Sequence, residues 1–218
     1  GSILHYLGET QHNKIQHVSS ISRIAEDEYV WMDKFTIRNL ELVHSTNNNA
    51  VTLLNVIDKT ISPMGGRLLK RWLALPLKNA DKIKQRHEVV NFLTKEKTTL
   101  QKIQNHIKHI GDLERLISKV ATGKVNPREV IQLKNSLEAI VPIKAISSAC
   151  NNQSLKIIGD TLQSCDVLRE KIKETLNEES PVNVLKGHTI APGFSSELDE
   201  LRGLSKSGKN YLDQMLTR

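Results

Sequence analysis

The stretch SPMGGRLLKRWLALPL, residues 62–77, decides the fold, because it specifies where a helix starts, which side of it is apolar and where it ends. Ser62 can cap the helix, and Pro63 suits the first turn, where its missing N–H costs nothing. Pro76 cannot continue a helix, so the helix ends about four turns later. We therefore predict one well-delimited helix with a structural role.

The two sides of this predicted helix differ in chemistry. At about 100° per residue, the apolar side comprises Gly65, Leu68, Leu69 and Trp72. The opposite side carries the cations Arg67, Lys70 and Arg71. Because a glycine on the apolar side lets another backbone approach closely, we predict a tightly packed core helix whose Gly65 and Trp72 fix a helix crossing.

The composition favours a mainly α-helical protein. A chain of 218 residues forms one large domain or two small ones, and only 4% of its residues are aromatic. Glycines (11) and prolines (6) are few, whereas Leu, Ile, Lys and Glu are abundant. No apolar run approaches the roughly 18 residues that a membrane-spanning helix needs. Two cysteines, Cys150 and Cys165, are too few for a disulfide framework, so we expect free thiols.

The net charge of +7 is unevenly distributed along the chain. Residues 67–128 carry 15 Lys or Arg against 5 Asp or Glu, whereas the remainder sums to −3. A basic belt of this size can attract nucleic acid. The alternative is that the lysines only solvate the outer faces of helices, because no aromatic side chains are interleaved with them. The sequence leaves both interpretations open.

Near the N-terminus the hydrophobic period changes from helix-like to strand-like. Positions within residues 18–24 alternate, and the β-prone run YVWM at residues 29–32 follows an acidic turn. We therefore predict a short two-stranded β ribbon at about residues 18–32. A short helix follows, for which Asp33 or Thr36 can serve as the cap.

From residue 51 to residue 141 the sequence predicts nearly continuous helix with breaks. The breaks are predicted at Pro76, Gly123 and Pro142. The following helices can be capped by Asn79 and Asn126. A further apolar stripe over residues 155–176 predicts another helix with Cys165 in the core.

The C-terminal part separates from this helical region. Residues 180–193 hold two prolines and two glycines and are typical of a connector. Ser195 can cap a helix that is still running where the sequence ends, so we expect a fragment of a longer protein. We predict two parts: a helical core domain over residues 1–194 and a truncated helix over residues 195–218.

Nucleotide and metal motifs in the chain lack the context that their chemistry needs. Residues 203–209 fit GxxxxGK, but they follow a charged helical run rather than the buried strand that a phosphate-binding loop requires. His106 and His109 share one side of a helix without a further ligand at metal spacing. We therefore assign no catalytic, cofactor-binding or metal-binding residue.

The remaining candidates favour packing over chemistry. Asp112, Glu114 and Arg115 lie together in HIGDLERL, where an inter-helix salt-bridge cluster is favoured over paired carboxylates for acid–base catalysis. Trp31 and Trp72 could stack on bases, but both lie in apolar runs typical of a core.

Four sequence blocks carry a family resemblance: MDKFTIRNLEL (residues 32–42), TLLNVIDKTISPMGGRLLKRWLALPL (52–77), IGDLERLISKVATGKVNPREV (110–130) and GFSSELDELR (193–202). Together, in this order, they resemble the core, or lever, region of the MutS family of DNA mismatch-repair proteins. The resemblance runs from about residue 4 to the end. It implies structural roles for the signature positions Arg38, Asn39, Pro63, Gly65, Arg67, Trp72, Asp112, Glu114 and Arg115.

The resemblance also implies an architecture and a role. In such proteins a mismatch-reading domain and a connector precede this region, two lever helices run to a DNA clamp, and an ATPase domain follows. The fragment would then link the ATPase and clamp domains mechanically, without catalysis of its own, and residues 195–218 would begin the outgoing lever.

The partners and cofactors implied by the resemblance belong to the full-length protein. They are mismatched duplex DNA, ATP with Mg²⁺, a second subunit and a MutL-type partner, in the cytoplasm near the nucleoid of a bacterium or in the nucleus of a eukaryote, without a membrane. The alternative function is an autonomous basic helical module that binds nucleic acid through residues 67–128.

Overall fold

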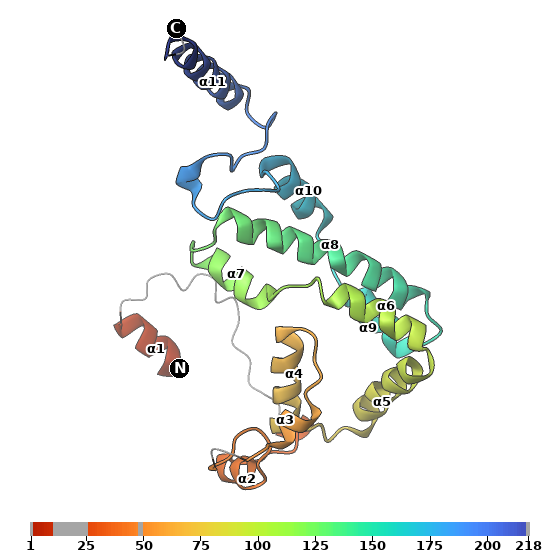
Figure 1. The fold of residues 1–218 in the computed structure, drawn as a ribbon. Coiled ribbons are helices and arrows are strands. Elements are labelled where there is room, and N and C mark those ends of the chain that lie inside the picture. The colour runs from red at the N-terminus through yellow and green to blue at the C-terminus, as the bar shows by residue number, and fades with distance from the viewer. Residues whose placement is uncertain (1, 11–25, 48–49, 217–218) are drawn as a thin grey trace.

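The computed structural model describes residues 2–10, 26–47 and 50–216 of the chain. Over these residues the chain is mainly helical, as predicted, but it carries no strand, whereas a short β ribbon was predicted (Figure 1). The helices are α1 (Ser2–Glu9), η1 (Glu26–Glu28), α2 (Lys34–Asn39), α3 (Leu53–Ile57), α4 (Pro63–Ala74), α5 (Ala80–Lys95), α6 (Lys97–Ile107), α7 (Leu113–Ala121), α8 (Pro127–Ala149), α9 (Gln153–Thr161), α10 (Asp166–Thr175), η2 (Val184–Lys186) and α11 (Ser196–Leu216).

The β ribbon predicted at residues 18–32 is not found in the described part of the chain. Its first half lies outside the described residues. Its second half makes one isolated bridge, between Tyr29 and Leu77. The backbone pairs there because Pro76 ends α4 and leaves its carbonyl free to accept the Val30 N–H at 2.7 Å. The prediction of a ribbon was therefore wrong where it can be checked: the β-prone run pairs with the segment after α4.

The core lies between α5, α6, α8 and α9. The long helix α8 is central, because it packs against α6, α7, α9 and α10. The buried cluster comprises Ile103, Ile143, Cys150 and Leu155. Partly buried side chains packed against it are Val89, Phe92, Leu93, Ile107, Ile110, Ile146 and Leu162. These residues carry the three-and-four spacing that predicted the helices.

Two predicted helix boundaries were wrong. Pro142 lies inside α8 instead of ending it, and the buried residues Ile140 and Ile143 on either side show that packing offsets the missing N–H. The single helix predicted over residues 155–176 is divided into α9 and α10. Cys165 lies at this break with a left-handed φ of 49° and is exposed, so it is not a core residue.

The closest approach between helices at a glycine joins α8 and α9. A Cβ added to Gly159 would lie only 2.7 Å from the Cβ of Ser147. Ser147 is itself 1% exposed, so neither residue has free space beside it. A side chain larger than hydrogen at position 159 would therefore push the two helices apart.

The helix α4 begins and ends close to the predicted positions. The Ser62 hydroxyl accepts the Gly65 N–H at 3.1 Å, Pro63 is the first helical residue, and Leu75 caps the end. The prediction that α4 is a core helix was wrong, because none of its described residues is buried and Leu68 and Trp72 are 47% and 41% exposed. The helix packs against α3 and stands beside the bundle instead (Figure 1).

Gly65 does not fix a crossing with another helix. A Cβ at this position would meet the Ser62 hydroxyl oxygen at 3.1 Å and the Cβ of Thr60 at 3.5 Å. Both atoms belong to the segment that leads into α4. The glycine therefore gives room to the helix cap and the preceding loop, and not to a second helix.

The last helix, α11, projects from one end of the bundle, whereas α2, α3 and α4 lie at the other (Figure 1). It follows a connector whose bridge between Leu176 and Ile190 lies next to the end of α10. Ser195 caps it as predicted, because its hydroxyl oxygen accepts the Leu198 N–H at 3.3 Å. No helix in the described residues is long and apolar enough to span a membrane.

Candidate functional site

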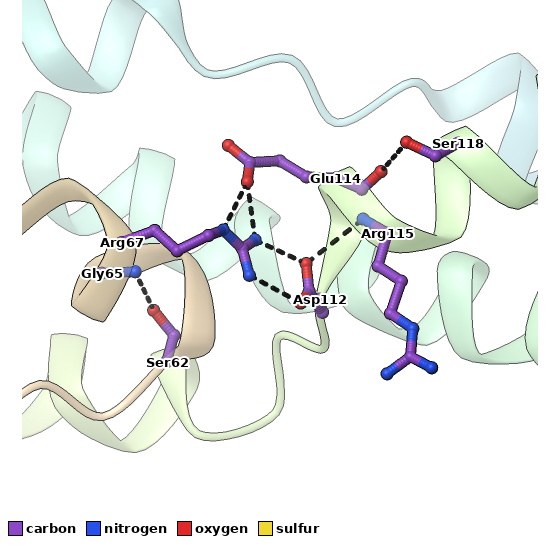
Figure 2. Close-up of polar contacts among 7 residues, drawn as sticks. All are labelled: Ser62, Gly65, Arg67, Asp112, Glu114, Arg115 and Ser118. Carbon is purple, nitrogen blue, oxygen red and sulfur yellow. Dashed lines mark hydrogen bonds and ion pairs between the residues drawn. The ribbon is translucent and has the colours of Figure 1, made fainter. Parts of the chain in front are cut away.

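A first polar joint connects α4 to α7, and we call Arg67, Asp112 and Glu114 the α4–α7 joint. Arg67 donates to both oxygens of Asp112, with Nη1 2.9 Å from Oδ2 and Nη2 2.7 Å from Oδ1. It also donates to Glu114 Oε2 through Nε at 2.8 Å and Nη2 at 2.6 Å. Figure 2 shows the guanidinium of α4 pointing between the two carboxylates. A planar fork of donors suits this two-carboxylate geometry better than an ammonium group would.

The α4–α7 joint is held together by charged side chains that are partly exposed to solvent. Hydrogen bonds from Arg67 lower the pKa of Asp112 below its ordinary value of 3.8, and the Arg115 N–H lowers it further. In turn Asp112 and then Glu114 raise the pKa of Arg67. The side chains of Arg67 and Asp112 are 48% and 22% exposed, so salt screens the attraction.

Arg115 makes its hydrogen bond to this joint through its backbone. Its N–H donates to Asp112 Oδ1 at 3.2 Å, which makes Asp112 the cap of α7. Its guanidinium points away from Arg67 in Figure 2. It lines an adjoining pocket of about 250 Å³, to which Asp112 also contributes and where Lys119 and Glu129 form an ion pair.

The remaining signature residues lie apart from the joint. On α2, the Arg38 guanidinium lies 5.2 Å from the centre of the Phe35 ring, and Asn39 is an exposed residue at the helix end. Trp72 is stacked on Arg86 of α5, with the guanidinium carbon 3.7 Å from the ring centre. This pair lines a mainly apolar groove of about 490 Å³ between α4, α5 and α9. The signature positions therefore lie at helix ends and in separate side-chain contacts, and the structure does not gather them in one catalytic cleft.

The exposed tryptophans correct the prediction of core packing. Trp31 is 65% exposed, and Trp72 is 41% exposed with one face of its ring against Arg86. The GxxxxGK match at residues 203–209 lies within the continuous helix α11. In the described residues no group of three or more His, Cys, Asp or Glu is arranged to hold a metal.

A second polar joint fixes the base of α11, and we call Gly193, Asp199, Arg202 and Ile190 the α11 latch. Asp199 Oδ2 accepts the Gly193 N–H at 2.6 Å. Arg202 donates to the Ile190 carbonyl through Nη2 at 2.9 Å and to Asp199 Oδ1 through Nη1 at 3.0 Å. Gly193 has a φ of 84°, which favours glycine, so the chain can turn back under the helix there.

The connector held by the latch is itself fixed to the bundle. The Ala191 N–H donates to the Thr175 carbonyl at 2.9 Å, at the end of α10. Ser180 is 1% exposed and donates to the Asn177 and Thr189 carbonyls. α10 packs on α8, so a continuous set of contacts leads from the bundle to the first turns of α11.

A buried lysine joins α8 to the segment between α10 and the connector. The Lys134 side chain is 6% exposed, and its Nζ lies 3.3 Å from Glu178 Oε1 and 3.6 Å from Glu138 Oε1. Neither the latch residues nor Lys134 was selected as a candidate from sequence. The signal for the latch was the block GFSSELDELR, whose Gly, Asp and Arg form it.

The comparisons with known proteins identify the family. The model of MutS domain III matches residues 35–217. Relatives named DNA mismatch repair protein MutS include those of Christiangramia forsetii, 66% identical over the whole chain, and of Flavobacterium psychrophilum, 66% identical over 98% of it. The protein of Bacteroides thetaiotaomicron is 50% identical over the whole chain.

The chain spans about a quarter of the length of these curated relatives, since it covers 25% of each. The resemblance predicted from the four sequence blocks is thereby confirmed. The chain belongs to the MutS family of DNA mismatch-repair proteins and corresponds to its domain III.

Proposed function

We propose that this chain is the mechanical core of a MutS-type DNA mismatch-repair protein. In this role it carries movement between the ATP-binding part and the DNA-clamping part of the whole protein and performs no catalysis. Residues 1–194 are the helical core domain, and residues 195–218 are the first part of the lever that leads toward the clamp.

The observation that carries the proposal is the α11 latch. A lever must be fixed at its base, or its far end moves independently of the body. Asp199 and Arg202 bind two backbone groups of the connector, the Gly193 N–H at the turn and the Ile190 carbonyl before it. The direction of α11 is therefore tied to the connector, and through it to α10 and α8.

The packing between the two ends supports transmission. The contacts run from α4 through Arg67 to α7, and from α7 through α8 and α10 to the latch. Densely packed helices resist compression, so a displacement at one end is passed on as a rigid movement. The α4–α7 joint is the weakest step in this series, because it is exposed and depends on charge.

The names of the relatives support the wider setting. They are mismatch-repair proteins, so we propose that the whole protein binds mismatched duplex DNA, uses ATP with Mg²⁺ outside this region, acts as a dimer and engages a MutL-type partner. The relatives come from bacteria, which favours the cytoplasm as its location.

The test uses Arg202→Ala in the whole protein, with Lys206→Ala as the matched control. Lys206 lies on the same helix, is exposed and has no ion pair in the described residues. We expect Arg202→Ala to retain ATP hydrolysis and mismatch binding but to lose most of the ATP-dependent change in DNA affinity. Lys206→Ala should keep this change. An unchanged ATP response in Arg202→Ala would contradict the proposal.

A further inference from the structure

The cations of the basic belt, residues 67–128, differ in whether they have partners, and exposed residues such as Lys70, Arg71 and Lys124 form no ion pair with the described residues. Several cations of the belt are already occupied by partners within the described residues. Arg67 binds Asp112, Lys82 pairs with Glu28, and Arg86 covers Trp72. Lys84 and Lys119 also lie next to carboxylates, so four of these five cations have a carboxylate partner and the fifth, Arg86, is stacked on an aromatic ring.

The outer side of α6 keeps its charges free. Lys97, Lys102 and Lys108 are exposed and form no ion pair with the described residues, and we call them the α6 lysine face. No carboxylate occurs in the sequence between Glu96 and Asp112. At about 1.5 Å per residue, the face extends over roughly 16 Å.

The opposite side of the same helix is committed to the core. Ile103 is 8% exposed, and Ile107 packs against the buried cluster. At about 100° per residue the exposed side of the helix spans about 140°, with Lys97 and Lys108 at one edge, Lys102 at the other, and the exposed residues Gln101 and Asn105 between them. The face is therefore uniformly polar, of one sign and turned away from the bundle.

We propose that the α6 lysine face binds the phosphate backbone of duplex nucleic acid without reading its sequence. Binding of phosphates needs only cations spaced along the polyanion, and the release of its counterions supplies the free energy. A protein partner needs buried apolar or aromatic anchors at the centre of its interface, and this face offers none. The helix also carries no arginine that could make paired hydrogen bonds to guanine.

This inference stands apart from the mechanical role. The core can transmit movement whether or not α6 touches DNA, and α6 can bind phosphates whether or not the α11 latch couples two domains. A failure of one therefore leaves the other in place.

The test measures binding of the 218-residue chain to a fluorescent 20-base-pair duplex over a series of salt concentrations. The variant is K97Q/K102Q/K108Q. The control is K171Q/K173Q/K186Q, which removes the same charge from lysines that are exposed in the described structure. Glutamine preserves helix propensity, and circular dichroism verifies that both variants are folded.

For three phosphate contacts the slope of log affinity against log salt should be about −2.7, from about −0.9 per contact. We expect the α6 variant to lose most of this slope and at least tenfold in affinity at low salt, while the control keeps the wild-type slope. Equal losses in both variants would overturn the proposal, because net charge alone would then explain binding. Absence of binding by the wild-type chain at low salt would overturn it as well. So would polyglutamate of equal charge competing as strongly as the duplex, because the partner would then be an acidic protein.

Discussion

Arg67 on α4 and Asp112 at the start of α7 face each other through two parallel hydrogen bonds of 2.9 and 2.7 Å. Because no residue of α4 is buried, this contact and the Trp72–Arg86 stack join the helix to the bundle by charge and surface contact rather than by a shared core. The helix α4 is thus held to the bundle by a few surface contacts, and the contribution of each contact can be tested.

Removal of the guanidinium should loosen α4 alone. In Arg67→Ala we expect faster amide exchange in Pro63–Ala74 and unchanged exchange in α8, because the α8 core does not involve this residue. Exchange measured by mass spectrometry distinguishes the two helices. Lys70→Ala is the control, since Lys70 is an exposed cation of the same helix without an ion pair in the described residues. Identical α4 exchange in both variants would refute the role of the joint.

The joint should also weaken in acid. Arg67 lowers the pKa of Asp112 below 3.8, so the folded chain holds this proton less tightly than the unfolded chain. The resulting stabilisation is present above pH 3.8 and is lost as the pH falls through the lowered pKa. In Asp112→Asn the stability should therefore depend less on pH on the acid side of about pH 4. Denaturant unfolding at a series of pH values checks this, and parallel curves for wild type and variant would contradict it.

The close contact of α8 and α9 predicts which glycine is indispensable for packing. Gly159→Ala places a Cβ 2.7 Å from that of Ser147, so we expect a loss of about 1–3 kcal/mol. Ser147→Gly in the same chain should restore part of it, because the opposing Cβ is removed. Thermal unfolding measures both, and additive losses in the double variant would be the contrary result. Gly65→Ala meets only the cap hydroxyl and Thr60, so its effect should be smaller.

The division of the predicted C-terminal stripe into α9 and α10 can be checked by thiol chemistry. Cys165 is exposed at the break, whereas Cys150 is 9% exposed within the core. We expect the Cys165 thiol to react with a maleimide within minutes and the Cys150 thiol to react only upon unfolding. Mass spectrometry identifies the labelled cysteine. Two slow thiols would instead favour the continuous helix predicted from sequence.

The parts that sequence predicted correctly are those determined within a few residues. Ser62, Asn79 and Asn126 cap their helices as expected, because a capping side chain acts on an N–H two or three residues ahead. The partners of Arg67 lie 45 and 47 residues away, and no local pattern specifies that pairing. A pattern of apolar residues also cannot distinguish a core helix from one that covers a neighbour, which is why α4 was misplaced.

The helix break near Cys165 and the continuation of α8 through Pro142 have the same physical cause. Both depend on tertiary packing: Lys144 Nζ donates to the Leu162 carbonyl at 3.0 Å beyond α9, and buried residues flank Pro142. The block GFSSELDELR contains Gly193, Asp199 and Arg202 of the α11 latch, but nothing in the sequence singled them out, because their contact with Ile190 depends on how the connector folds back.

The most direct test of the central claim is the distance between α8 and α11 measured by paired spin labels. Cysteines introduced at the exposed positions Asn135 and Ser205, with Cys165→Ser to remove the native exposed thiol, provide the labels. If the latch fixes the lever, the wild-type background gives one narrow distance distribution and Arg202→Ala gives a clearly broader one. Equally broad distributions in the two chains would show that Arg202 does not hold the lever and would contradict the mechanical account.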